Sequence, residues 1–118
     1  MLTIRKARAT TRASIPTAAK REEGGSGSTN TIAAICAAPG VLAHAGLLKG
    51  RTATSYPGFL RPDSAPGLQL SEAPVVIDGK VVTSRGPGTA IEFGLALIGL
   101  LEGSPAAQIV RDRLQLPA

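Results

Sequence analysis

Residues 31–39, which read TIAAICAAP, decide the fold of this chain. The run Thr31–Ile35 is apolar and too short for a helix, which is typical of a buried strand in a parallel sheet. Helical composition follows over Ala37–Leu48, where Pro39 suits a first turn and Gly50 a stop. The stretch therefore predicts a strand, a sharp turn at the cysteine, and a helix.

The middle of the chain predicts further strands. Residues 52–56 alternate in polarity and indicate a short strand, while the proline-rich residues 58–74 indicate a long loop. Residues 75–77 and 80–83 flank Asp78-Gly79, a dipeptide that favours a hairpin with a type I′ turn because both central residues of that turn need positive φ. We therefore expect a hairpin here.

Two helices are predicted at the C-terminal end. Thr89 and Glu92 form a capping-box pattern that opens a helix ending near Glu102, with Gly103 as its stop. This helix is apolar almost all round, so we expect it to be covered on more than one side. Ser104-Pro105 opens a short final helix, and the order of elements predicts an α/β layer fold.

The N-terminal residues differ in composition from the rest. Residues 1–23 hold six Lys or Arg against two Glu, and residues 24–28 read GGSGS, which is a linker composition. We expect residues 1–30 to be a disordered head and residues 31–118 to form the domain. The head is either an organelle transit peptide or the product of an incorrect gene model, and composition does not separate these alternatives.

Composition excludes several classes of function. The net charge of +5 is concentrated in the head, and the chain has three aromatic residues, so we expect no nucleic-acid surface. The single cysteine excludes an internal disulfide, and the chain shows neither a zinc-binding cluster nor a cofactor motif. We expect no metal and no cofactor.

The sequence also bears on location. No apolar run approaches the 18 or so residues that cross a bilayer, and residues 1–23 lack the continuous apolar stretch that is typical of a secretory signal. We expect no membrane association and a cytoplasmic location, or an organelle matrix if the head is a transit peptide.

Cys36 is the candidate nucleophile. A cysteine that lies between a strand and a helix, among small residues, is typical of a nucleophile elbow, in which a sharp turn exposes the side chain. The positive end of the helix dipole favours the thiolate, and the N–H groups of Ala37 and Ala38 are placed to donate to an oxyanion. His44 lies about two helical turns, roughly 12 Å, further along and is too far for direct proton transfer.

Two separated motifs carry a resemblance to a known family. Residues 34–39 (AICAAP) and residues 77–89 (IDGKVVTSRGPGT), followed by residues 92–94 (EFG), resemble the cysteine turn and the hairpin loop of the ThiJ/PfpI superfamily of glyoxalases and deglycases. The resemblance covers about residues 31–116. It implies the C-terminal half of a flavodoxin-like doubly wound sandwich, a fold that is often dimeric.

The resemblance also implies roles for individual residues. Cys36 takes the place of the nucleophile, and the pocket is formed by Tyr56, Arg85, Gly86 and Pro87. Many members have a histidine where this chain has Tyr56. The family's glutamate partner of the thiol and its glycine-rich oxyanion loop belong to an N-terminal half that has no match in this sequence.

The resemblance implies a cysteine-dependent glyoxalase or deglycase that acts on small α-oxoaldehydes or glycated proteins, and we expect it to be impaired by truncation. Two alternatives stay open, namely a non-enzymatic fragment that is redox-sensitive or chaperone-like under oxidative stress, and a truncated gene model of a full-length enzyme. The resemblance also implies a homodimer as one form of the protein. Because the neighbours of the cysteine strand belong to the missing half, we expect an unpaired strand edge and poor stability or self-association.

Overall fold

The computed structural model describes residues 2–5 and 30–117, and its centre is a four-stranded mixed sheet. The order of the strands is β1 (Leu2–Arg5), β2 (Asn30–Ile35), β6 (Val81–Ser84) and β5 (Val75–Asp78). β2 and β6 are parallel, whereas β1 and β5 run antiparallel to their neighbours. The carboxyl ends of β2 and β6 therefore lie side by side, with Ile35 opposite Ser84.

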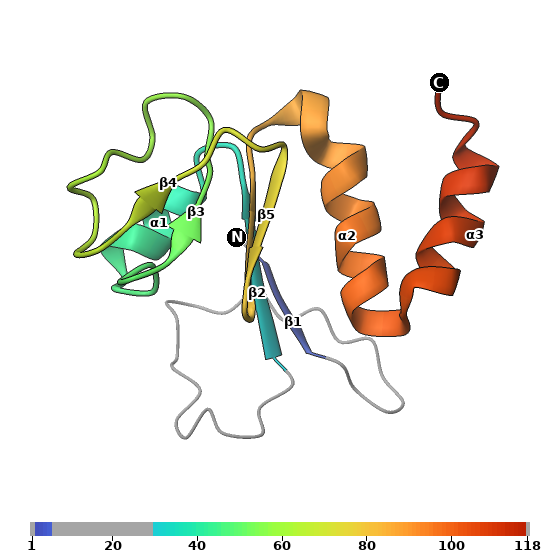
Figure 1. Cartoon of the computed structure of the whole chain (residues 1–118), viewed down its shortest axis with the longest axis horizontal. Coiled ribbons are helices and arrows are strands. Elements are labelled where there is room, and N and C mark those ends of the chain that lie inside the picture. The colour runs from blue at the N-terminus through green and yellow to red at the C-terminus, as the bar shows by residue number, and fades with distance from the viewer. Residues whose placement is uncertain (1, 6–29, 118) are drawn as a thin grey trace.

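Smaller elements cover both faces of this sheet. They are α1 (Pro39–His44), β3 (Thr52–Ala53), β4 (Gln69–Leu70), a 3₁₀ turn (Pro87–Thr89), α2 (Ala90–Glu102) and α3 (Ser104–Leu114). α1 and the two-stranded β3–β4 sheet lie on one side, and α2 and α3 lie on the other (Figure 1). The expected α/β layer architecture is confirmed.

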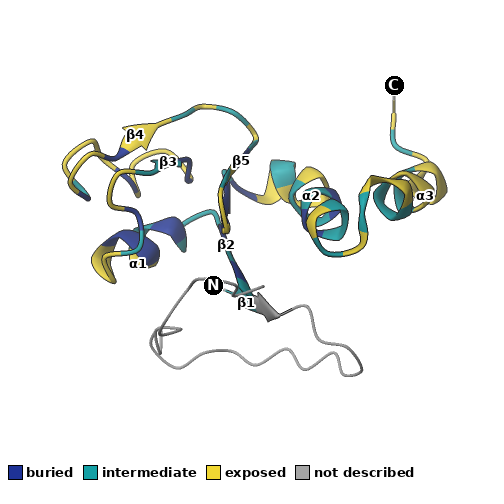
Figure 2. Ribbon diagram, turned by 60° about the horizontal axis from the view of Figure 1, so that its bottom comes forward, coloured by how far each residue is buried: buried dark blue, intermediate teal, exposed yellow. Residues whose placement is uncertain are grey.

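The core is divided by the sheet into two clusters. Successive residues of a strand point to opposite faces, so Ala33 and Ala34 of β2 serve different layers. Ala34 packs with Leu42 and Leu48 of the α1 layer, whereas Ala33 packs with Val82 and Leu97. Both alanines are buried, as expected for a strand that is covered on both faces. Figure 2 shows β2 between α1 on one side and α2 on the other.

Several boundaries differ from the sequence-based predictions. The helix expected over residues 37–48 spans only Pro39–His44, because Gly46 and Gly50 turn the chain with φ of 80° and 67°. The strand expected over residues 52–56 is only the two residues of β3. The expected long loop contains β4, which pairs in parallel with β3.

The hairpin is confirmed, but its turn is of another type. Asp78 pairs with Val81, so the two-residue loop is Gly79-Lys80. Gly79 has φ of 60°, and Lys80 does not have positive φ. A type I′ turn needs positive φ at both positions, whereas glycine at the first position alone is typical of a type II′ turn.

The two C-terminal helices are confirmed with one correction. α2 ends at Glu102, and Gly103 has φ of 94°. The predicted capping box is wrong, because the Glu92 side chain accepts hydrogen bonds of 3.0 and 3.3 Å from Arg111 on α3. These bonds and the Glu92 charge raise the pKa of Arg111 above its ordinary value. α2 is less covered than expected, since the side chains of Ile91 and Leu100 are exposed.

The expectation that residues 1–30 form a disordered head is wrong for Leu2–Arg5 and for Asn30. Leu2–Arg5 forms β1, which pairs with β2 from Leu2 opposite Ala33 to Arg5 opposite Asn30. The β2 edge that we expected to be unpaired is therefore covered by a strand of the same chain. The rest of the predicted head, residues 6–29, lies outside the described residues.

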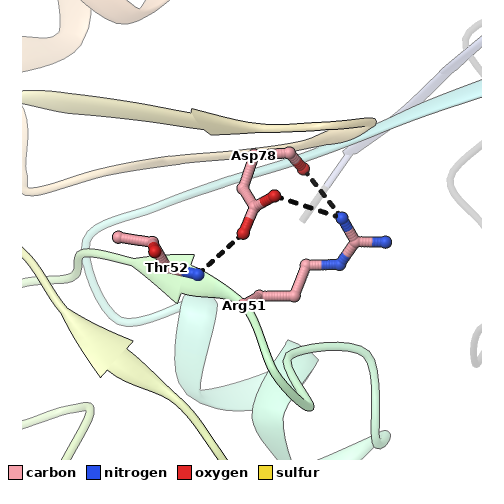
Figure 3. Close-up of polar contacts among 3 residues, drawn as sticks. All are labelled: Arg51, Thr52 and Asp78. Carbon is pink, nitrogen blue, oxygen red and sulfur yellow. Dashed lines mark hydrogen bonds and ion pairs between the residues drawn. The ribbon is translucent and has the colours of Figure 1, made fainter.

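A polar contact ties the β3 layer to the hairpin. Asp78 accepts a hydrogen bond of 2.7 Å from the Thr52 backbone N–H at Oδ2, and Arg51 donates to the Asp78 backbone carbonyl at 3.0 Å (Figure 3). The Arg51 guanidinium also lies 3.5 Å from Asp78 Oδ1. This cluster fixes the start of β3 against the tip of the hairpin.

Candidate functional site

Cys36 lies in a tight turn at the carboxyl end of β2. Its φ is 65°, a left-handed value that costs a residue with an ordinary side chain, such as cysteine, roughly 1–2 kcal/mol relative to glycine. The Ala38 backbone N–H closes the turn with a hydrogen bond of 3.1 Å to the Ile35 carbonyl, and α1 begins at the next residue. The structure thus has the strand-cysteine-helix turn that the sequence predicts.

The backbone of Cys36 is held from two directions. Its N–H donates to the Ser84 carbonyl at 3.1 Å, and its own carbonyl accepts from the Tyr56 N–H at 2.8 Å. The residue as a whole is half-buried, and the cysteine is a free thiol. Its neighbours therefore come from β6 and from the segment that follows β3.

The two predicted oxyanion donors differ in availability. The Ala38 N–H is engaged by the Ile35 carbonyl, so it is not free for a ligand. The Ala37 N–H has no hydrogen-bond partner within the described residues. Ala37 is therefore the better placed of the two predicted donors.

Only some of the predicted pocket residues lie next to one another. A Cβ on Gly86 would lie 3.2 Å from Cδ2 of Tyr56, so the tyrosine ring rests on the backbone of the Arg85–Pro87 loop. Arg85 is half-buried and forms no ion pair or hydrogen bond with a described residue, and Pro87 is exposed. The structure brings Cys36, Tyr56 and Gly86 together but does not place the Arg85 guanidinium against them.

Sequence reasoning missed three residues beside this site. Phe59 stacks edge-on against Tyr56 with ring centroids 6.1 Å apart, and both rings are about half exposed. Ser84 and Thr89 join their hydroxyls at 2.6 Å behind the loop. Ser84 and Thr89 lie on either side of the turn at residues 85–88, and this placement of two hydroxyl residues is the sequence signal that could have predicted their contact.

Other possible sites lie apart from these residues. A groove of about 390 Å³ lies between β5, α2 and α3, and none of the predicted site residues lines it. Within residues 2–5 and 30–117 no group of three His, Cys, Asp or Glu side chains is placed to hold a metal ion. No helix of the described ranges is long and apolar enough to cross a membrane.

Comparison with known proteins defines the class. The model of the DJ-1/PfpI family matches residues 20–100, more than half of the chain. The chain therefore belongs to the DJ-1/PfpI family. It is 44% identical over 96 residues to Protein dj-1beta of Drosophila melanogaster, covering 80% of this chain and 49% of the relative. It is 39% identical over 71 residues to a deglycase of Pyrococcus abyssi, covering 60% of this chain and 43% of the relative.

Solved structures agree with the family assignment. The crystal structure of Drosophila melanogaster DJ-1beta has a TM-score of 0.67 at 43% identity, covering 75% of this chain and 47% of that one. The oxidized form of Toxoplasma gondii DJ-1 has a TM-score of 0.66 at 42% identity with the same coverage. The chain spans about half or less of the length of these relatives. The resemblance seen in the sequence is thereby confirmed.

Proposed function

We propose that the chain is a cysteine-dependent glyoxalase- or deglycase-type protein that acts on methylglyoxal-type α-oxoaldehydes or their protein adducts. The observation that carries this proposal is the conformation of Cys36, a half-buried thiol held at φ of 65° between β2 and α1. Strained backbone is retained where the surrounding structure over-determines it, and such positions cluster at active sites. A relative that is named a deglycase adds support.

The first chemical step follows from this geometry. The Cys36 thiolate adds to the aldehyde carbon, a C–S bond forms, and the carbonyl π pair moves to the oxygen. The Ala37 N–H, which has no other partner within the described residues, donates to that oxyanion. Protonation of the oxygen gives a hemithioacetal on Cys36.

The later steps need proton transfer. Conversion of methylglyoxal to lactate adds one water and moves a proton between the two carbonyl carbons. No hydrogen bond joins a carboxylate to the Cys36 thiol within residues 30–117. A positioned acid or base contributes about 10²–10⁴-fold, so we expect the adduct to form readily and lactate to appear slowly.

The test uses the unmodified chain and a Cys36→Ser variant. After incubation with methylglyoxal, peptide mapping should find a reversible adduct at position 36 of the unmodified chain, with slow lactate formation that the variant loses. Adducts on lysine and arginine serve as the internal control, because both proteins should carry them equally. Absence of the residue-36 adduct would overturn the proposal.

The partly exposed Cys36 residue, which is a free thiol, and the similarity to a DJ-1 structure in its oxidized form favour a second candidate, a redox-sensitive protein. Here the thiolate attacks a peroxide oxygen and releases hydroxide or water, giving a sulfenic acid, and a second equivalent gives a sulfinic acid. Mass spectrometry after peroxide treatment should find two added oxygens on Cys36. A thiol that stays reduced at peroxide concentrations that oxidise free cysteine would exclude this role.

A further inference from the structure

A chain of hydroxyl groups runs behind the cysteine turn. The Gly86 N–H donates to Thr89 Oγ1 at 3.1 Å, Thr89 Oγ1 lies 2.6 Å from Ser84 Oγ, and Ser84 Oγ lies 2.7 Å from the Pro74 carbonyl oxygen. Each hydroxyl has one hydrogen, so two arrangements fit: Ser84 donates to Pro74 while Thr89 donates to Ser84, or Ser84 donates to Thr89 while Thr89 donates to the Gly86 carbonyl. In both arrangements Thr89 Oγ1 accepts the Gly86 N–H.

The Ser84 end of this hydroxyl network is connected to Cys36 through β6. Ser84 is the last residue of β6 and is completely buried. Its side chain takes part in the hydroxyl chain, while its carbonyl accepts the Cys36 N–H at 3.1 Å. A shift of the Ser84 peptide would therefore change the hydrogen bond that holds the Cys36 N–H.

The other end reaches Cys36 through Tyr56. Thr89 Oγ1 accepts the Gly86 N–H at 3.1 Å and lies 3.0 Å from the Gly86 carbonyl oxygen, so one hydroxyl group contacts both backbone polar groups of Gly86. The Tyr56 ring rests on Gly86, and the Tyr56 N–H donates to the Cys36 carbonyl at 2.8 Å. Both backbone hydrogen bonds of the strained residue are thus made by neighbours of one hydroxyl network.

We propose that Thr89 and Ser84 are positioning residues that hold Cys36 in its left-handed conformation. Strained backbone persists where the surrounding structure over-determines it, and the hydroxyl network supplies that constraint to Cys36 from both sides. Neither side chain takes part in the chemistry. The inference rests on the proposed function only in taking Cys36 as the reactive group, and its test does not depend on turnover.

Amide hydrogen exchange, resolved by NMR on the whole chain, tests the proposal. Thr89→Val keeps the shape of the side chain and removes the hydroxyl, so the Cys36 and Tyr56 amides should exchange roughly tenfold faster. Thr89→Ser keeps the hydroxyl and should return both rates to within about twofold of the original. Asp78→Ala is the control, because it weakens the fold at the opposite end of β6. It should leave unchanged the ratio of the Cys36 and Tyr56 exchange rates to the rates of neighbouring strand amides.

Three results would overturn the proposal. They are unchanged exchange at Cys36 in Thr89→Val, a failure of Thr89→Ser to restore it, and an equal local effect of Asp78→Ala. If Thr89→Val does not fold, hydrogen exchange of the unsubstituted protein still tests the proposal. Its Cys36, Tyr56 and Gly86 amides should open as one unit and show similar protection. Independent opening of Gly86 would contradict the proposal. An original chain that shows this pattern but forms no methylglyoxal adduct would refute the proposed chemistry and support the positioning role.

Discussion

Asp78 accepts the Thr52 backbone N–H at 2.7 Å, and this short charge-assisted hydrogen bond connects the hairpin tip to the β3 layer. Asp78→Ala leaves that N–H without its partner, so we expect a loss of about 1–3 kcal/mol in the free energy of unfolding. The Arg51 ion pair adds little, because both side chains are more than one-third exposed and the charges are 3.5 Å apart. Urea denaturation measures the change.

The matched control is Asp63→Ala. Asp63 pairs with Arg61 at 3.5 Å, but both side chains are more than three-quarters exposed, so its loss should change stability by less than about 0.5 kcal/mol. Equal effects of the two substitutions would show that the Asp78 bond to Thr52 contributes nothing.

Thr54 offers a stabilising substitution. Its residue is 2% exposed, and its hydroxyl has no hydrogen-bond partner within the described residues. Valine has the same shape without the buried polar group, so Thr54→Val should be neutral or raise the free energy of unfolding by about 1 kcal/mol.

Thr83→Val is the matching opposite case. Thr83 Oγ1 accepts the buried Thr54 N–H at 3.0 Å, and its loss should destabilise the chain by about 1–3 kcal/mol. A destabilising Thr54→Val would mean that the Thr54 hydroxyl has a partner, such as a bound water.

Two glycines should respond to alanine in opposite directions. Gly79 has φ of 60°, and an added Cβ would lie 2.9 Å from Nη1 of Arg51. That atom ends a flexible side chain, so the backbone strain of roughly 1–2 kcal/mol should dominate the loss in Gly79→Ala. Gly94 lies inside α2 with open space at its Cβ position, so Gly94→Ala should stabilise by about 0.5–1 kcal/mol. Thermal unfolding of the two variants compares them, and shifts of the same sign would contradict this reasoning.

The elements that the sequence predicted well have strong local signals. The apolar run before Cys36, the Asp78-Gly79 dipeptide and Gly103 each specify structure within a few residues, and all three mark real element boundaries. The position of Cys36 at a turn also follows from local pattern. Its chemistry and substrate remain proposals.

What the sequence did not predict depends on contacts between distant residues. β3 and β4 are two residues each, and their pairing arises only when residues 52–53 and 69–70 meet in space. The hydroxyl chain of Ser84 and Thr89 likewise joins Pro74 to the loop after β6. β1 lies in a basic, polar stretch, where composition hides its pairing with β2.

The pairing of β1 gives a prediction about association. Deletion of residues 2–5 uncovers one edge of β2, and open strand edges recruit other chains, so the shortened protein should associate more strongly. Size-exclusion chromatography with light scattering compares the two proteins. Lys6→Ser loses one positive charge, as the deletion does at Arg5, and keeps residues 2–5, so it is the control for charge. A deletion variant with the same mass distribution as the original chain would show that β1 does not protect this edge.

The backbone strain at Cys36 predicts how glycine and alanine at this position will differ in stability. Because φ of 65° suits glycine, Cys36→Gly should be more stable than Cys36→Ala by about 1 kcal/mol, although both variants lose the thiol. Comparing glycine with alanine at this position removes the contribution of the sulfur and leaves the backbone preference. Ala37→Gly is the control, since Ala37 does not have positive φ and glycine there should destabilise by roughly 0.5–1 kcal/mol. Urea denaturation of the four proteins, including the original chain, gives these differences. A Cys36→Gly variant no more stable than Cys36→Ala would mean that the turn relaxes in solution, and the geometric basis of the proposed reactivity would be lost with it.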